Sequence, residues 1–150
     1  MLMDEPFGAI DPIVRARLQD EFLRLQQEVR KTVVFVTHDI DEAIKVGDKI
    51  AILRRGGRLA QYDTPSEILE NPADDFVAEF VGADRALKAL ALHTIAELEL
   101  GPVADGPRVT SATTLRDALA LLVEHHGRTL AVTDDEGRVV GSVTRDDILR

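Results

Sequence analysis

Apolar residues near the start of the chain form two continuous runs separated by a stretch with helical spacing. The runs MLMD and TVVFVT predict buried strands, and the second has the pattern of a strand covered on both faces in a parallel sheet. Between them, Asp11 and Pro12 form the expected cap and first residue of a helix that ends near Arg30. Steps of three or four residues separate its apolar positions, so we expect this helix to bury one face, made of Val14, Leu18, Phe22, Leu25 and Val29.

The middle of the chain predicts a short helix, a hairpin and two more short helices. DIDEAIKVG indicates a helix closed by Gly47, and KIAILRRGGRLAQYD predicts two strands that turn at Gly56 and Gly57. TPSE, at Thr64–Glu67, has the sequence of a capping box with proline in the first helical turn. A second amphipathic pattern in DDFVAEFVG then predicts one more short helix.

The pattern weakens between residues 84 and 107, where GPVADGP contains two glycine and proline breaks. Beyond it, TTLRDALALLVEHHG predicts a capped helix, and its final His125 and His126 favour interaction with the helix dipole over metal binding. TLAVTDDEGRVVGSV predicts two strands, and TRDDIL a last helix capped by Thr144. We therefore expect two parts, residues 1–88 and 89–150.

Composition limits the possible functions. The chain has 150 residues, 45% of them hydrophobic, which is enough for a real core. Its net charge of −9 is distributed over both parts, so nucleic acid is not an expected partner. Cysteine is absent, which excludes disulfides and thiolate metal sites. No apolar run is long enough to cross a bilayer, so any membrane function would depend on a partner chain.

Two adjacent acids, Asp4 and Glu5, follow the first predicted strand, and His38 follows the second. Burial of either carboxylate without a partner is costly, which predicts a metal ion or another cation nearby. Each residue also has an ordinary explanation, since the acids suit a solvated turn and the histidine suits a loop or helix cap. Their order along the chain, together with the capped helix between them, favours one shared site.

LMDEPFGAID and VTHDIDEA resemble the C-terminal half of the ATP-binding subunit of an ABC transporter. The resemblance implies an α/β fold, in which residues 1–88 form the C-terminal half of a P-loop NTPase sheet with its helices. It implies that Asp4 holds Mg²⁺ through water and that Glu5 orients and activates the attacking water. It also implies that His38 reaches the γ-phosphate of ATP. Such a site suits phosphoryl transfer, which depends mainly on positioning and charge neutralisation.

Residues Gly8, Ala9 and Asp11 fall in GAID, which resembles the D-loop that crosses the dimer interface of these subunits. FGAIDPIVRARLQDEFLRLQQEV and the segment from GGRLAQYD to ALKAL resemble subunits of osmoprotectant importers for glycine betaine, choline or other quaternary amines. The implied partners are a second ATP-binding subunit in a homodimer, transmembrane permease subunits and, through them, an extracytoplasmic substrate-binding protein. The implied cofactors are ATP and Mg²⁺, and the implied location is the cytoplasmic face of the membrane, as a peripheral protein.

The sequence contains no G-x-x-x-x-G-K-[ST] stretch and no Leu-Ser-Gly-Gly-Gln signature, which the family places before the segments matched here. We therefore expect Met1 to be a fragment boundary or a misassigned start. We also expect no ATP hydrolysis from this chain alone, because nothing in it would hold the β- and γ-phosphates.

Residues 89–150 resemble a single CBS motif, a small α+β regulatory module that normally pairs with a second one. Its closing pattern is Gly141, Thr144 and Asp147, where the last two can contact the phosphate or ribose of an adenosine-type ligand in the family. Helix capping explains the same two residues equally well. An alternative function is therefore a non-catalytic regulatory protein that senses a nucleotide or ionic strength through its CBS motif, and a P-loop encoded upstream of Met1 would decide against it.

Overall fold

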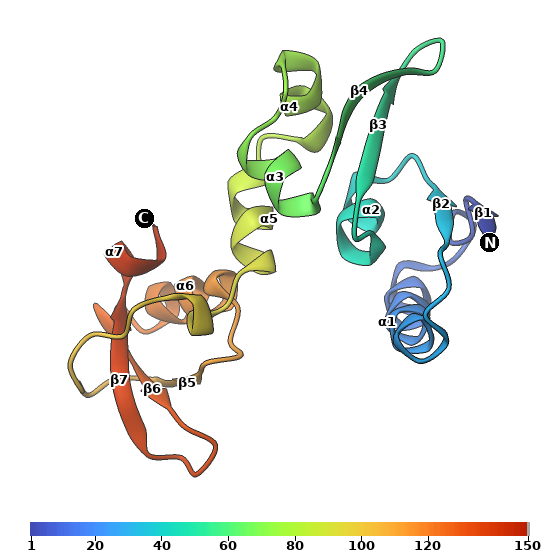
Figure 1. The fold of residues 1–150 in the computed structure, drawn as a ribbon. Coiled ribbons are helices and arrows are strands. Elements are labelled where there is room, and N and C mark those ends of the chain that lie inside the picture. The colour runs from blue at the N-terminus through green and yellow to red at the C-terminus, as the bar shows by residue number, and fades with distance from the viewer. Residues whose placement is uncertain (150) are drawn as a thin grey trace. The chain divides into compact units, whose positions relative to one another are not determined.

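The computed structural model describes residues 1–149 and has a mixed α/β fold (Figure 1). The chain divides into two compact units, Met1–Ala83 and Asp84–Arg150. The first contains β1 (Leu2–Asp4), α1 (Pro12–Val29), β2 (Val34–Val36), α2 (Ile40–Val46), β3 (Ile50–Arg54), β4 (Arg58–Asp63), α3 (Pro65–Glu70) and α4 (Asp75–Val81). The second contains α5 (Arg85–Leu92), η1 (Ile95–Glu97), β5 (Arg108–Thr110), α6 (Leu115–Glu124), β6 (Thr129–Thr133), β7 (Val139–Thr144) and α7 (Arg145–Ile148). The boundary expected between residues 88 and 89 falls inside α5.

Strands β1 and β2 pair in parallel, with Leu2 opposite Val34 and Asp4 opposite Val36. The helix between them begins as predicted, because the Asp11 side chain accepts hydrogen bonds from the first backbone N–H groups of α1 and Pro12 needs no such partner. One side of this small sheet packs on α1 through three phenylalanine rings with centroids 5.7–6.5 Å apart, from Phe7, Phe22 and Phe35.

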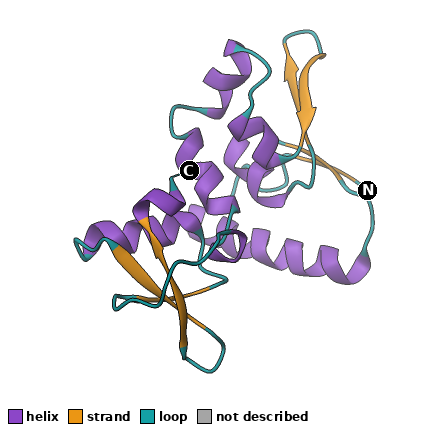
Figure 2. Ribbon diagram, turned by 60° about the vertical axis from the view of Figure 1, so that its left-hand side comes forward, coloured by secondary structure: helices purple, strands orange, loops and turns teal. Residues whose placement is uncertain are grey.

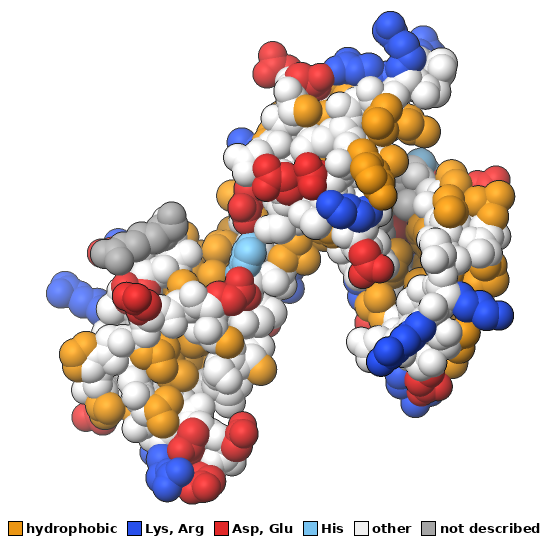
Figure 3. All heavy atoms as spheres, viewed as in Figure 1, with side chains coloured by type: hydrophobic (Ala, Val, Ile, Leu, Met, Phe, Trp, Pro, Cys, Tyr) orange, Lys and Arg blue, Asp and Glu red, His pale blue; other side chains and the backbone are white. Residues whose placement is uncertain are grey.

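The predictions that β1 is buried and that β2 is covered on both faces are wrong for this chain. Leu2 is 71% exposed and Val34 57% exposed. Side chains alternate across a strand, so the face opposite Phe35 carries Leu2, Val34 and Val36, and no described element covers it. The predicted buried face of α1 is also largely wrong, since four of its five residues are exposed, namely Val14, Leu18, Leu25 and Val29. Apolar side chains accordingly gather on this part of the surface in Figure 3.

The predicted hairpin is confirmed, with β3 and β4 antiparallel and Gly56 and Gly57 at the turn. Their φ angles of 77° and 72° lie in the left-handed region that glycine adopts without steric cost. The helix cap predicted after the hairpin is also present, because the Thr64 side chain accepts from the Glu67 N–H at the start of α3. Asp39, which was not predicted as a cap, caps α2. The core of this part is completely or nearly completely buried and consists of Ile50, Ile52, Ile68, Leu69, Val77 and Val81.

The second unit is a three-stranded sheet with helices (Figure 2). Strand β6 lies in the middle, parallel to β5 and antiparallel to β7. The predicted helix α6, the two strands β6 and β7, and the cap of α7 by Thr144 are confirmed. A compact apolar core joins the sheet to its helices and contains Ile95, Val109, Leu115, Ala118, Leu122, Leu130, Val132, Val143 and Ile148.

Three elements between residues 84 and 110 were not predicted, namely α5, η1 and β5. Helix α5 packs against α6, while η1 contributes the fully buried Ile95 to the core. Close packing explains the glycine of the closing pattern. A Cβ on Gly141 would lie 2.8 Å from Leu100 Cβ and 3.0 Å from the Gly101 carbonyl oxygen. Within residues 1–149, no helix is both long and apolar enough to span a bilayer.

Candidate functional site

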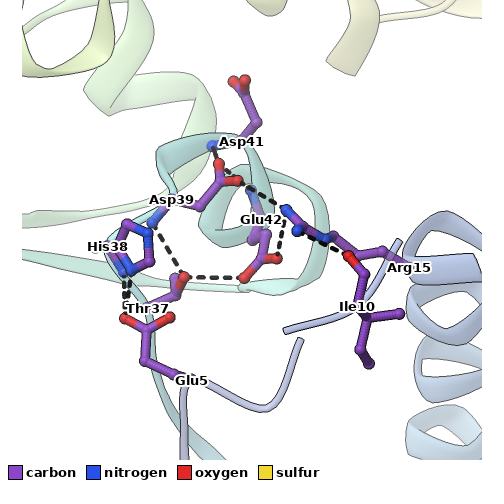
Figure 4. Close-up of polar contacts among 8 residues, drawn as sticks. All are labelled: Glu5, Ile10, Arg15, Thr37, His38, Asp39, Asp41 and Glu42. Carbon is purple, nitrogen blue, oxygen red and sulfur yellow. Dashed lines mark hydrogen bonds and ion pairs between the residues drawn. The ribbon is translucent and has the colours of Figure 1, made fainter. Parts of the chain in front are cut away.

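The structure brings Glu5 and His38 together at the carboxyl ends of the two parallel strands (Figure 4). Glu5 continues the strand pairing, since its N–H donates to the Val36 carbonyl at 2.8 Å. Its side chain then accepts from the His38 backbone N–H at 2.8 Å, and the same oxygen, Oε1, lies 2.7 Å from His38 Nδ1. Both contacts fix the histidine relative to the carboxylate.

Glu5 has an unusual backbone, with φ at 46°, in the left-handed region that a residue with a Cβ rarely adopts. Its second carboxylate oxygen, Oε2, is buried and has no hydrogen-bond partner within the described part of the chain. The site of a Cβ on Gly8 would lie 3.5 Å from Oε2, so a glycine there leaves room beside this oxygen. Glu5 can therefore hold His38 with one oxygen and accept a further hydrogen bond with the other.

The carboxylate of Glu5 raises the pKa of His38 above its ordinary value of 6.5, mainly through the side-chain hydrogen bond. A raised pKa means that the contact stabilises the folded state fully below pH 6.5, and that this contribution is lost as the pH rises through the pKa of the folded protein. The His38 side chain is 81% exposed, so solvent weakens the effect. In the protonated form both ring nitrogens are donors, which leaves Nε2–H available to an anion while Nδ1–H contacts Glu5.

A polar network that was not predicted from the sequence connects the two residues next to His38 with Arg15 and Glu42. Thr37 Oγ1 donates to Glu42 Oε2 at 2.9 Å and accepts from the Asp39 N–H at 3.0 Å. The Arg15 guanidinium lies 3.5 Å from a carboxylate oxygen of Asp39 and from one of Glu42. Glu42 is only 4% exposed, although the sequence places it in an amphipathic helix like many solvated acids. The feature of the sequence that could have identified Glu42 is the occurrence of Thr37, Asp39 and Glu42 close to His38 along the chain.

The other residues expected at this site have less defined roles in the structure. The side chain of Asp4 is exposed at the end of β1, and Gly8 and Ala9 are exposed in the loop before α1. Asp11 caps α1 by accepting from the Ile13 N–H at 2.9 Å. Among residues 1–149, no three histidine or acidic side chains are grouped closely enough to hold a metal ion. The Mg²⁺ assignment to Asp4 thus stays a prediction.

In the second unit, Thr144 and Asp147 lie together and form a capping box at the start of α7. The Thr144 hydroxyl donates to Asp147 Oδ2 at 2.6 Å, and the Thr144 N–H donates to the same oxygen at 2.9 Å. The helix-capping role considered for these residues is therefore present in the structure. Their predicted contact with an adenosine-type ligand is not tested by this geometry.

The family model of the CBS domain matches residues 103–150. Osmoprotectant import ATP-binding protein OsmV from Salmonella typhimurium is 45% identical over 148 residues, which are 97% of this chain and 37% of that protein. Glycine betaine/carnitine/choline transport ATP-binding protein OpuCA from Bacillus subtilis is also 45% identical, over 95% of this chain and 37% of its own length. Glycine betaine uptake system ATP-binding protein YehX from Escherichia coli is 37% identical over 99% of this chain and 49% of its own length.

The chain thus spans less than half the length of each of these relatives. Among solved structures, that of CBSX2 in complex with AMP covers 88% of this chain and 78% of its own chain at 19% identity. The TM-score between the two structures is 0.27. The sequence relatives extend over both compact units, whereas the CBS model matches the second unit alone. Over nearly its whole length the chain is therefore similar to ATP-binding proteins of osmoprotectant import systems, and residues 103–150 match the model of the CBS domain.

Proposed function

We propose that this chain is the C-terminal part of a subunit that hydrolyses ATP to drive import of glycine betaine, choline or related quaternary amines. The observation that carries the proposal is the contact of Glu5 with both the backbone and the ring of His38, where the parallel strands β1 and β2 end. In this proposal residues 1–88 complete a P-loop NTPase sheet together with an upstream half. The exposed apolar face formed by Leu2, Val34 and Val36 supports such a sheet, because the helices and strands of a larger domain would bury these side chains.

The proposed chemistry uses the two oxygens of Glu5 for different tasks. Oε1 holds His38. Oε2, which is buried and has no hydrogen-bond partner among residues 1–149, accepts a hydrogen bond from the attacking water and orients it. The protonated His38 ring donates from Nε2 to an oxygen of the γ-phosphate. Mg²⁺, when bound with ATP, supplies charge neutralisation, and the exposed carboxylate of Asp4 is suited to contact it through water.

The proposed partners follow from the family and not from any contact in this chain. We propose a homodimer of ATP-binding subunits, in which Gly8, Ala9 and Asp11 belong to the loop at the subunit interface. This dimer would bind permease subunits at the cytoplasmic face of the membrane, and an extracytoplasmic binding protein would deliver the amine to them. The non-catalytic sensor remains the alternative, and the homology of the first unit to transport ATP-binding proteins favours the transporter.

A hybrid protein tests the proposed transport function. In the hybrid, this chain replaces the matching segment of the Salmonella typhimurium relative, in cells that lack the intact relative. We expect the hybrid to restore uptake of labelled glycine betaine at high external salt, because the upstream half then supplies the phosphate-binding groups. Cells with the intact relative define the upper limit of uptake, and cells with neither protein define the lower limit. No uptake above the lower limit, with hybrid and relative present in equal amounts at the membrane, would refute the proposal.

We further propose that the CBS domain regulates this activity by binding an adenosine-type ligand near Thr144 and Asp147. Support comes from the adjacent hydroxyl and carboxylate, which can hydrogen-bond to a ribose. Calorimetric titration of the chain with AMP is expected to give an affinity that falls about tenfold in Asp147→Ala, as expected for loss of a hydrogen bond to a charged group. Asp146→Ala, which removes the neighbouring exposed acid, is the matched control. Equal AMP affinity in the wild type and Asp147→Ala would disprove the ribose contact.

A further inference from the structure

One arginine joins the loop before α1 to the turn that holds His38. Arg15 lies in the first turn of α1, and its NH2 group donates to the Ile10 carbonyl at 3.1 Å. Its NH1 group lies 3.5 Å from Asp39 Oδ2 and 3.5 Å from Glu42 Oε1 (Figure 4). A single planar guanidinium therefore contacts two segments that are more than twenty residues apart in the sequence.

The contacts of Glu42 continue from this arginine to both neighbours of His38. Glu42 accepts from the Thr37 hydroxyl, which in turn accepts from the Asp39 N–H. Asp39 is also held by Arg15, and it caps α2 by accepting from the Asp41 N–H at 2.9 Å. The residues immediately before and after His38 are thus fixed by one connected network, while the histidine ring itself is exposed.

Burial sets this network apart from the ordinary ion pairs on α1. Arg15 is 27% exposed and Glu42 4%, whereas the pair of Arg24 and Glu21 on the same helix is 66% and 59% exposed. Exposed pairs contribute little because water screens them, but a buried carboxylate without its cation is strongly unfavourable. Loss of the Arg15 cation would therefore leave the buried Glu42 carboxylate without this charged partner, which is expected to change the local structure.

We propose that Arg15 and Glu42 are positioning residues that couple the conformation of the loop at residues 8–11 to the placement of the His38 ring. The functional role of this coupling rests on the proposed function, in which His38 contacts the nucleotide and the loop contacts the partner subunit. Displacement of the Ile10 carbonyl changes the position of the guanidinium. Through Asp39, and through Glu42 and Thr37, it then changes the turn from which His38 reaches Glu5.

The test measures the placement of His38 by NMR in the full 150-residue chain. Arg15→Met removes the guanidinium, and Arg24→Met makes the same change at the exposed pair on the same helix. The first readout is hydrogen exchange of the His38 backbone N–H, which donates to Glu5. The second is the pKa of the His38 ring, which is faced by the carboxylates of Glu5, Asp39 and Glu42. His93, which lies in the second unit and contacts Glu97, is an internal reference for the titration.

We expect Arg15→Met to speed exchange of the His38 N–H about tenfold or more and to lower the ring pKa toward 6.5, because the Glu5 contact becomes less populated. Arg24→Met should leave both values unchanged. The direction of the pKa change is decisive, since loss of a nearby positive charge with His38 still in place would raise the pKa instead. Arg15→Lys keeps the charge without the planar fork, so it should change both values in the same direction by a smaller amount, and it carries the test if Arg15→Met does not fold.

An unchanged or raised pKa with unchanged exchange in Arg15→Met would overturn the proposal. Equal acceleration at the N–H of Ile52, which is buried in the hairpin of the same unit, would also overturn it by showing a general loss of stability. Neither readout requires nucleotide, a permease or turnover. A negative result here would therefore leave the proposed ATPase untouched, and a failure of the hybrid transporter would not alter the measured coupling.

Discussion

Replacement of Glu5 by glutamine is expected to lower the ATP hydrolysis rate of the hybrid subunit about a hundredfold or more, as is typical when a group that acts in the transition state is removed. Glutamine keeps the size of the side chain and one carbonyl oxygen, so it can still accept from the His38 N–H. It cannot keep both functions, because its second terminal atom is an amide nitrogen that donates. The attacking water proposed to bind at Oε2 would then lose its acceptor.

The measurement is phosphate release from Mg-ATP by the purified hybrid, with His38→Ala as a second variant expected to show a loss of similar size. Glu28→Gln is the matched control, since it makes the same chemical change at an exposed position of α1 and should retain full turnover. Wild-type turnover in both Glu5→Gln and His38→Ala would show that these residues are not the catalytic pair. Nucleotide binding measured separately distinguishes a lost chemical step from a lost site.

Substitution of Leu130 by alanine is expected to lower the free energy of unfolding of the second unit by about 2–5 kcal/mol, because a buried leucine loses both its transfer energy and its packing. Leu130 is 0% exposed and lies in the central strand β6, within the core that joins the sheet to α6 and α7. Domains of this size are stable by only about 5–15 kcal/mol in total. The variant should therefore be largely unfolded at temperatures that the wild-type chain tolerates.

Urea unfolding followed by NMR signals of β6 and β7 measures this effect. Fluorescence is a poor choice, since the chain has no tryptophan and its single tyrosine, Tyr62, lies in the first unit. Leu87→Ala provides the control, because this leucine is 52% exposed on α5 of the same unit. Its replacement should lower the free energy of unfolding only slightly. Equal midpoints for Leu130→Ala and Leu87→Ala would contradict the assignment of Leu130 to the core.

Local signals in the sequence predicted helix starts and turns well. Asp11, Thr64, Thr114 and Thr144 each cap the helix expected of them, because a cap depends only on a side chain and the next few backbone N–H groups. The turn at Gly56 and Gly57 is equally local, since it depends on backbone angles that few other residues adopt. The approach of His38 to Glu5 was expected from their order along the chain and from a resemblance, and not from local chemistry.

Burial and the supporting contacts were less predictable, since they depend on elements far along the chain. The apolar spacing of α1 predicted a buried face, yet Leu18 and Leu25 remain exposed because no described element covers them. Helix α5 lies in a stretch of weak pattern and depends on α6 for its packing. Arg15 looked like one of several charged residues on a helix, and only its distances to Asp39 and Glu42 distinguish it.

The left-handed backbone of Glu5 places stability and activity in conflict at a single position. A glycine at position 5 would adopt a φ of 46° without the steric cost that a Cβ imposes, so selection for a more stable fold alone would favour it. It would also remove the carboxylate that holds His38. Under the proposed function, a lineage that preserves glutamate here accepts a strained residue in return for its chemistry.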